Sequence, residues 1–381
     1  MAVKPASGRD SVSGLNLFFT GKCNLSCEYC FVDKKKLENR VLDENLLKKS
    51  VDLFLLYSGN RKVIGFSGGE PMMEKSLLMK ACDYARKIAR KKKMDLRIAV
   101  ATNGTLLDKK IMDYLGKIGA EVKISIDGKS LVHDKNRPFK KRLGKSSFQE
   151  IIKNVKCLKG KGFGLTASMV FSPLNIDQLL EGIEFLRKSG FSQIDFFPDL
   201  FSTWKPAELE KMKKTFNKFA VYYAALFLRG KKTFKNSFLA GLLTPVDFSK
   251  AETCEKINFG PDGKAYVCDK VFSLKPSFRR KYLIGSIKDG VNNEKRRKLL
   301  EKIRKNFYQE SGLECEKCEY FKFCFCPAGH YIISPLAKSS SSDFFKSFCS
   351  VAKIYIITFS RLKNALKFNE RFIDFYGNKE L

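Results

Sequence analysis

Three cysteines, Cys23, Cys27 and Cys30, stand close together near the start of the chain. Their spacing, Cys-x3-Cys-x2-Cys, allows a single loop to carry three thiolates to one metal centre. A structural zinc site or a self-contained iron–sulfur cluster usually takes four protein ligands. Three ligands leave one coordination position open, and an open position is where a metal centre performs chemistry. The loop therefore predicts a reactive metal centre.

The cysteine usage of the whole chain supports a metal-binding protein. Of twelve cysteines in 381 residues, three lie at 23–30 and four at 315–326. No run approaches the ~20 apolar residues of a membrane span, and the N-terminus lacks the apolar core of a signal peptide. We therefore expect a soluble, cytoplasmic protein with no membrane partner. In that compartment, clustered cysteines more often bind metal or act in catalysis than form disulfides.

The chain is strongly basic, with 72 lysines and arginines against 40 acidic residues and a net charge of +32. Solvated basic faces explain such a charge, as would an acidic peptide substrate or nucleic acid. The basic residues are spread along the chain, with short runs at 90–93 and 140–142. Since no signature of an RNA- or DNA-reading domain is present, we do not expect a nucleic-acid partner.

Short apolar segments alternate with helical patterns in the first two hundred residues. The predicted strands are 15–19, 63–66, 96–101, 122–126, 165–170 and 193–197, and the intervening helices include 42–57, 77–92, 108–118, 148–159 and 176–188. Strand–helix units in series predict an α/β fold with a parallel sheet. Six units make a partial (β/α)6 barrel, similar to a TIM barrel but not closed. Polar motifs follow these strands, and ligands gather at the C-terminal strand ends of such sheets, so we expect one shared site.

The remaining segments differ from this alternation. We predict an N-terminal tail at 1–14, the barrel at 15–235, a cysteine-rich domain at 236–349 and a C-terminal helix at 350–381, with a serine-rich loop at 338–343. Since only fourteen residues precede the first strand, we expect no leader-peptide-recognition domain before the barrel. That favours short or separately presented substrates.

The first cysteine loop resembles the signature of the radical S-adenosylmethionine (SAM) enzymes. The resemblance rests on Cys23, Cys27 and Cys30, with Tyr29 before the last cysteine. It implies a [4Fe–4S] cluster whose open iron binds SAM. In that family an electron from the cluster cleaves SAM, and the resulting 5′-deoxyadenosyl radical abstracts a hydrogen atom from the substrate.

Four further segments resemble parts of the same family and imply cofactor-binding residues. The Ser-Gly-Gly-Glu-Pro stretch at 67–71 is similar to a motif that contacts the methionine amino group, and glycines there let the backbone approach closely. The segments after the third and fourth predicted strands are similar to family segments near SAM or substrate. Each of these later segments also fits an ordinary turn or a core hydrogen bond. The cofactor-binding residues implied are Gly68, Gly69, Glu70, Thr102, Asn103, Ser125 and Asp127.

The later cysteines resemble the SPASM extension of radical SAM enzymes that modify peptides and proteins, including the anaerobic sulfatase-maturating enzymes. The resemblance implies two auxiliary [4Fe–4S] clusters. The sequence departs from the family where Cys324-Phe-Cys326 replaces a longer spacing. A zinc ribbon on the four cysteines at 315–326 is the alternative, since paired thiolates also suit zinc. The metal ligands implied are Cys254, Cys268, Cys315, Cys318, Cys324, Cys326 and Cys349.

The resemblance implies an oxidoreductase that abstracts a hydrogen atom from a peptide or protein, causing oxidation, crosslinking or epimerisation. Asp269, directly after Cys268, is by resemblance a candidate catalytic base, although it also fits a structural hydrogen bond. A low-potential electron donor of the flavodoxin or ferredoxin type is the expected partner. The alternatives are a small-molecule radical SAM dehydrogenase and a zinc-bearing nucleic-acid-binding module.

Overall fold

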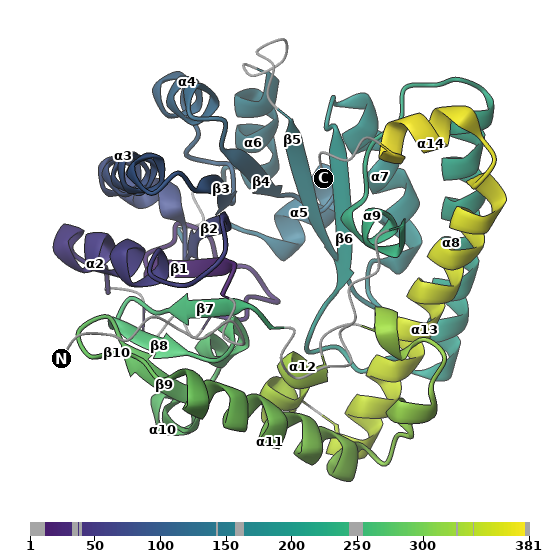
Figure 1. Ribbon diagram of the computed structural model, residues 1–381. Helices are drawn as coiled ribbons and strands as arrows, with labels where there is room; N and C mark the ends of the chain where they lie inside the picture. Colours follow the sequence, from purple (N-terminus) through teal and green to yellow (C-terminus); the bar gives the residue numbers. More distant parts are fainter. Residues whose placement is uncertain are drawn as a thin grey trace. The chain divides into compact units, whose positions relative to one another are not determined.

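The computed structural model describes residues 12–32, 37, 40–141, 144–156, 164–243, 254–324, 327–337 and 339–377 (Figure 1). The chain divides into two compact units, each built from distant segments. Unit 1 contains residues 1–125, 136–163 and 254–303, and unit 2 contains 126–135, 164–253 and 304–381. The boundaries predicted at residues 14, 235 and 349 remain predictions.

Unit 1 is built on a sheet in which β1–β4 pair in parallel in sequence order. These strands confirm the first four predicted ones: β1 (Gly14–Thr20), β2 (Arg61–Gly68), β3 (Asp95–Thr102) and β4 (Glu121–Ser125). On the other side of β1 the sheet continues through β7, which is parallel to β1, and then antiparallel β8, β9 and β10. This extension, which we did not predict, comprises β7 (Lys256–Phe259), β8 (Lys264–Tyr266), β9 (Leu283–Ser286) and β10 (Gly290–Val291).

Helices follow the parallel strands of unit 1 and bury one apolar face each. In α3, for example, Leu78, Ala81, Cys82 and Ala85 are all buried, at the spacing expected of one helix face. Asp43 and Asp108 cap α2 and α4 by accepting hydrogen bonds from backbone amides in the first turn, an arrangement that starts a helix at a defined residue. The main helices are α2 (Glu44–Phe54), α3 (Lys75–Lys91), α4 (Lys109–Lys117) and α6 (Ser147–Lys156), with short α10 (Pro276–Arg279) after η4 (Asp269–Ser273).

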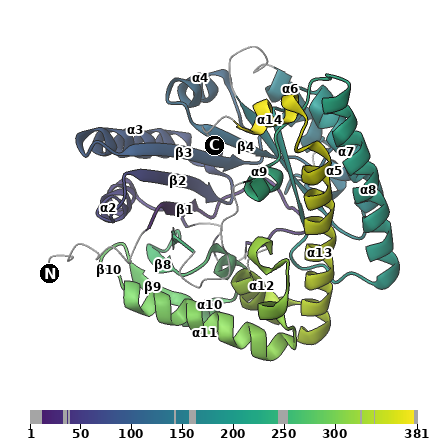
Figure 2. The ribbon, with the colours of Figure 1, turned by 45° about the vertical axis from the view of Figure 1, so that its right-hand side comes forward.

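Unit 2 contains the last two predicted strands, β5 (Leu165–Phe171) and β6 (Gln193–Pro198), which pair in parallel. Its core is aromatic: the Phe196 ring lies within 6 Å of those of Phe216, Phe219, Tyr355 and Phe359. In Figures 1 and 2 the long helix α13 runs beside α8. The helices are α5 (Ser130–Asn136), α7 (Leu179–Lys188), α8 (Pro206–Leu228), α9 (Ser237–Leu243), α12 (Pro327–Ile333), α13 (Ser341–Leu366) and α14 (Glu370–Gly377), and α11 (Asn293–Ser311) spans the two units.

The C-terminal helical region differs from the prediction in where it starts. Helix α13 begins at Ser341, so the predicted loop at 338–343 is wrong beyond Ser340. The hydroxyl of Ser340 accepts a hydrogen bond of 3.2 Å from the amide of Asp343. Serine is a preferred N-cap residue, so the serine run is a helix start. Position 338 lies outside the described residues.

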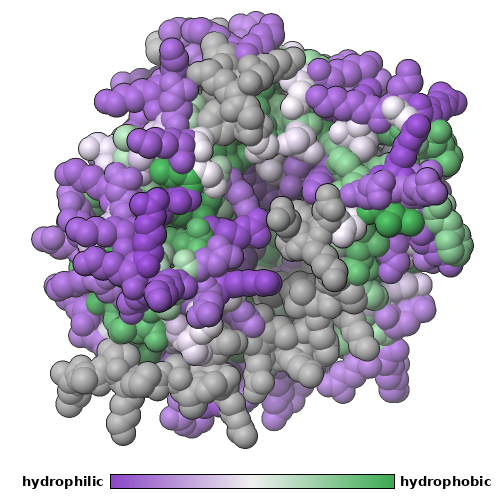
Figure 3. Space-filling view, turned by 45° about the horizontal axis from the view of Figure 1, so that its top comes forward, coloured by the Kyte–Doolittle hydropathy of each residue, from purple (hydrophilic) through white to green (hydrophobic). Residues whose placement is uncertain are grey.

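The surface matches the basic composition. Hydrophilic side chains dominate the face shown in Figure 3, with smaller apolar areas between them. None of the helices within the described residues has both the length and the apolar character needed to cross a bilayer.

Replacing Gly128 by alanine is expected to destabilise unit 2. Gly128 has φ +86°, and a Cβ there would lie 2.6 Å from the Cα of Gly182 in α7. Backbone strain and overpacking together predict a loss of at least roughly 2 kcal/mol, measured as a lower urea midpoint of unfolding. The matched control is Gly241→Ala in α9, where no atom lies within 4 Å and helix propensity predicts a gain of up to ~1 kcal/mol. Equal effects of the two changes would contradict this packing.

Candidate functional site

The three-cysteine loop follows β1 and is held in place by residues far away in the sequence. The amide of Ser26 donates to the carbonyl of Pro138, and that of Glu28 donates to the carbonyl of Asn136, at 2.8 and 2.9 Å. The Arg137 guanidinium lies 5.0 Å from the centre of the Tyr29 ring, within cation–π range. These contacts give the loop a defined shape, with the thiols of all three cysteines half-buried.

The three thiols share an electrostatic environment. Burial raises the pKa of Cys23 to about 11; the backbone amide of Leu25 opposes this, while the negative charges of Glu70, Cys27 and Cys30 reinforce it. Cys27 and Cys30 therefore lie close enough to Cys23 for their thiolates to disfavour its ionisation. A bound metal reverses this preference, because metal ligation requires deprotonated thiols and releases their protons. The loop suits a cationic centre.

The glycine turn after β2 packs directly on the start of the cysteine loop. The amide of Gly69 donates to the carbonyl of Thr20 at 2.8 Å, and that of Glu70 to the carbonyl of Lys22 at 2.6 Å. A Cβ at Gly68 would overlap the Thr20 carbonyl oxygen. Only glycine therefore allows this approach, and the structure brings two sequence-predicted motifs together.

Glu70 joins this turn to the end of β3. Its side chain is fully buried, and its carboxylate accepts hydrogen bonds from the Thr102 hydroxyl (2.6 Å), the Asn103 amide (2.6 Å) and the Met72 amide (2.9 Å). Burial raises the pKa of Glu70, and these donors offset part of that rise. A buried carboxylate is costly unless hydrogen-bonded, so these donors are what keep it in place.

Asn103 extends the connection to the cysteines. Its side-chain amide donates to Asn24 Oδ1 at 2.8 Å and lies 3.9 Å from Cys23 Sγ. Asn24 in turn donates to the Thr105 hydroxyl at 2.8 Å. The sequence analysis singled out Asn103 but missed Asn24 and Thr105. Their positions in the sequence could have indicated them, since Asn24 lies between the first two cysteines and Thr105 directly follows the Thr-Asn-Gly segment.

The two later candidates lie in different units. Ser125, half-buried, ends β4 in unit 1. Asp127 belongs to unit 2, where its carboxylate accepts a 3.0 Å hydrogen bond from the amide of Val170 in β5. The Asp127 amide donates to Nδ1 of the buried His133 at 3.2 Å. Asp127 therefore positions the end of β5 within its own unit.

Cys268 and Asp269 lie beside the first cysteine loop in unit 1. The Cys268 thiol is 3.6 Å from Asp269 Oδ1, and the Lys270 ammonium pairs with the same carboxylate at 3.5 Å. That ammonium also lies 4.9 Å from the centre of the ring of Phe31, the residue after Cys30. Burial would raise the pKa of Asp269, but the nearby cations and the Cys268 thiol together hold it below its usual value. Asp269 is therefore an ionised carboxylate next to predicted metal ligands.

The other auxiliary cysteine of unit 1 is Cys254, a half-buried residue that follows the undescribed segment 244–253. Its carbonyl accepts a hydrogen bond from the Arg296 guanidinium. Cys326 lies outside the described residues.

Four cysteines of unit 2 line one cavity of about 620 Å³. They come from three short segments and from helix α13: Cys315, Cys318, Cys324 and Cys349. Burial raises the pKa of Cys315 to about 11, and the nearby Cys349 and Cys318 thiolates add to the rise. Cys315 and Cys324 pack against a cluster of buried aromatic residues that includes Phe307 and Phe345.

The spacing of these thiols differs from that around a single ion. Within the part of the chain that the structure describes, no three His, Cys, Asp or Glu side chains converge enough to hold one metal ion. The four cysteines instead lie around the cavity of about 620 Å³. An iron–sulfur cluster takes thiolates on separate iron atoms and so needs ligands placed farther apart than a single zinc ion does.

Comparisons with known proteins agree with this arrangement. A family model described as "Radical SAM superfamily" matches residues 17–186. The uncharacterized protein MJ0907 of Methanocaldococcus jannaschii is 31% identical over 219 residues, covering 56% of this chain and 73% of that protein. A cysteine-type anaerobic sulfatase-maturating enzyme of Clostridium perfringens is 24% identical over 328 residues, covering 79% and 84%. The solved structure of native anSMEcpe with bound AdoMet and Kp18Cys peptide shares the fold, with 22% identity, a TM-score of 0.70 and coverage of 93% and 99%.

Replacing Thr102 by valine tests the Glu70 connection. The change removes one donor to a buried carboxylate, which predicts a loss of about 1–3 kcal/mol in the free energy of unfolding, measured by thermal denaturation. The control is Thr166→Val on β5, a half-buried threonine whose hydroxyl has no hydrogen bond among the described residues. Its effect should stay within about 0.5 kcal/mol. Equal destabilisation by the two changes would show that Thr102 does not hold Glu70.

Proposed function

Because the chain belongs to the radical SAM superfamily, and within it to the SPASM-type subgroup, we propose that it cleaves S-adenosylmethionine and abstracts a hydrogen atom from a peptide or protein. The observation that carries the proposal is the meeting of three motifs in unit 1. The cysteine loop, the turn at Gly68–Glu70 and the strand end at Thr102–Asn103 are joined by direct hydrogen bonds.

Cys23, Cys27 and Cys30 would hold a [4Fe–4S] cluster, which supplies the electron that cleaves the sulfonium of SAM. The protein's own contribution is to shape the site around it. The Leu25 amide donates to Cys23 Sγ at 3.4 Å, and hydrogen bonds of this kind stabilise a thiolate. The glycines leave the backbone of the turn open to the amino acid end of SAM. Glu70 stabilises this turn through its buried carboxylate, which already accepts the three hydrogen bonds described above.

A peptide or protein substrate is supported by the relatives. One is a sulfatase-maturating enzyme, and a structural neighbour holds a peptide together with AdoMet. Within this class we favour side-chain oxidation over crosslinking or epimerisation. Asp269 is the reason: it is ionised, its side chain is 35% exposed, and Lys270 joins it to the residue after the cysteine loop. A carboxylate so placed can accept the proton that an oxidised side chain must lose.

The later cysteines would hold two auxiliary [4Fe–4S] clusters. We assign Cys315, Cys318, Cys324 and Cys349 to one, because they share a cavity. Cys254 and Cys268, which both belong to unit 1, would then serve the other. This assignment differs from the zinc ribbon, which would use the four cysteines at 315–326, because it includes Cys349, a residue that lines the cavity with Cys315, Cys318 and Cys324.

The proposed reaction also needs an electron donor. Reductive SAM cleavage requires a low-potential electron, for which a flavodoxin or ferredoxin in the cytoplasm is the natural donor. Such acidic proteins are attracted by a chain whose net charge is +32, because opposite charge speeds association.

Replacing Cys27 by alanine should abolish reductive SAM cleavage, because two thiolates do not hold the cluster. The measurement is 5′-deoxyadenosine formed after anaerobic reconstitution with dithionite. Cys82→Ala is the matched control: Cys82 is a buried thiol of α3, and its loss should leave cleavage intact. Continued 5′-deoxyadenosine formation by the Cys27 variant would overturn the proposal.

Replacing Cys318 by alanine should remove an auxiliary cluster and spare the first. Three clusters of four irons predict about twelve irons per chain, and the variant should hold about eight. It should still cleave SAM but should leave a substrate peptide unmodified, as followed by mass spectrometry. One zinc and about four irons in the unaltered protein would instead establish a zinc ribbon. Absence of any mass change on peptides encoded nearby would favour a small-molecule substrate.

A further inference from the structure

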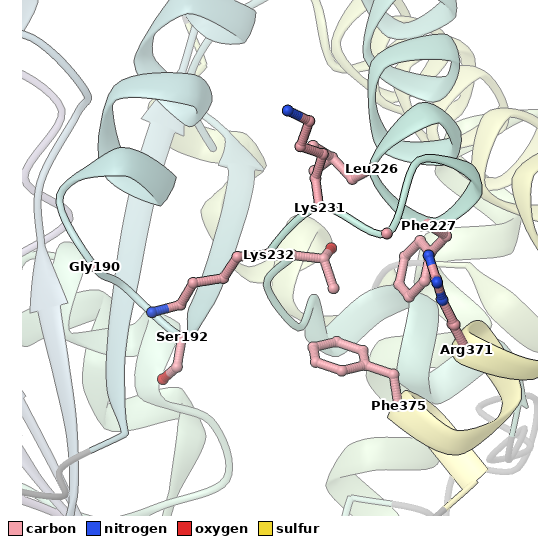
Figure 4. A pocket seen from close by; sticks show the side chains of 10 residues that line it. Gly190, Ser192, Leu226, Phe227, Lys231, Lys232, Arg371 and Phe375 are labelled. Atoms are coloured by element: carbon pink, nitrogen blue, oxygen red, sulfur yellow. The ribbon is translucent and has the colours of Figure 1, made fainter.

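A second cavity lies in unit 2, beside the start of β6. Its volume is about 440 Å³, and its walls come from the residues before β6, the end of α8 with the turn that follows, and α14 (Figure 4). Asp127, by contrast, contacts Val170 near the C-terminal end of the neighbouring parallel strand. A strand of this length spans about 17–20 Å. The cavity is therefore separate from Asp127, the one predicted cofactor-binding residue that belongs to unit 2.

The charges around this cavity are all positive. Lys231, Lys232 and Arg371 line it, and no lining residue is acidic. Among the described residues, none of these three side chains forms an ion pair. The ammonium of Lys235, 5.6 Å from the centre of the Phe375 ring, adds a further charge nearby.

Helix electrostatics explains only part of this arrangement. The two lysines follow the C-terminal end of α8, where the helix dipole favours cations. Arg371 is different, because it lies in the first turn of α14, where the dipole favours anions. Its guanidinium lies against Gly230, which has φ +61° after the end of α8, so that a Cβ there would make Arg371 Nη1 shift. A glycine here makes room for the guanidinium beside the cavity.

The apolar part of the wall is aromatic. The rings of Phe227 and Phe375 lie 5.7 Å apart at an interplanar angle of 69°. In Figure 4 the Phe375 and Arg371 side chains reach in from α14, while Lys232 extends toward Ser192 on the opposite side. A few polar groups set around an apolar wall are the usual composition of a small-molecule site, and the volume is in the usual range of about 300–1,000 Å³.

We propose that this cavity binds a small organic phosphate that carries a flat ring, of the nucleoside monophosphate class. The ring would lie against Phe375 and Phe227, and the phosphate would lie at Arg371, with Lys232 adding positive charge from the opposite wall. Arginine suits this role because its planar fork pairs with two phosphate oxygens at once. The occupant would add contacts between α8 and α14, so its binding should also raise the melting temperature.

Calorimetry on the full-length protein tests the proposal with three matched probes: uridine 5′-monophosphate, inorganic phosphate and uridine. Uridine avoids the adenosine group of SAM. We expect the monophosphate to bind at least tenfold more tightly than either part alone. Equal affinity for the monophosphate and inorganic phosphate, or no binding of the monophosphate, would overturn the proposal.

Variants locate the site. Arg371→Gln should weaken monophosphate binding about tenfold, the effect expected of one charged hydrogen bond, and Lys232→Gln, which removes a more distant charge, should weaken it less. Phe375→Leu should weaken binding of the monophosphate but leave that of phosphate unchanged. Lys305→Gln, at an exposed lysine of α11, is the control and should change nothing. Unaltered monophosphate binding by folded Arg371→Gln protein would also overturn the proposal. None of these measurements depends on SAM cleavage.

Discussion

The buried carboxylate of Glu70 is the interaction on which the architecture of unit 1 depends. It stands where the glycine turn after β2 meets the end of β3, and it accepts hydrogen bonds from Met72 on one side and from Thr102 and Asn103 on the other. Backbone hydrogen bonds from Gly69 and Glu70 to the residues before Cys23 complete the connection. Isolated loops have many conformations, and fixing each residue costs about 1–2 kcal/mol. The hydrogen bonds of one buried carboxylate, together with these backbone hydrogen bonds, offset part of this cost.

The two places that we propose to hold clusters share one physical property. In the first loop and in the cavity of unit 2, burial and neighbouring thiolates disfavour the charged form of a cysteine. Such groups release protons when a metal binds, so folding and cofactor loading are coupled. The aromatic residues behind Cys315 and Cys324 exclude water on one side, and solvent exposure is one of the factors that set the potential of an iron–sulfur cluster.

In unit 2, the two ends of the strands carry different features. Near the C-terminal end of β5, Asp127 and His133 hold the backbone through buried hydrogen bonds. At the opposite end of β6, the strand start, α8 and α14 form the cationic cavity. Between these ends lies a close-packed core of aromatic rings around Phe196. This core holds the two strand ends in fixed positions within unit 2.

The sequence by itself determined the six parallel strands, the cysteine loop and the glycine turn, because these depend on local pattern: apolar runs, close spacing of thiols, and glycines where no Cβ fits. The start of α13 was also locally encoded, but the serine run was interpreted as a loop and not as a cap. Tertiary structure alone decided the rest. Strands β7–β10 have only two to four residues each, too few to show a period. The role of Glu70 as a buried acceptor, the grouping of Cys349 with Cys315, and the meeting of Gly230 with Arg371 all join residues distant along the chain. Such contacts depend on how elements pack, which local propensity and spacing do not encode.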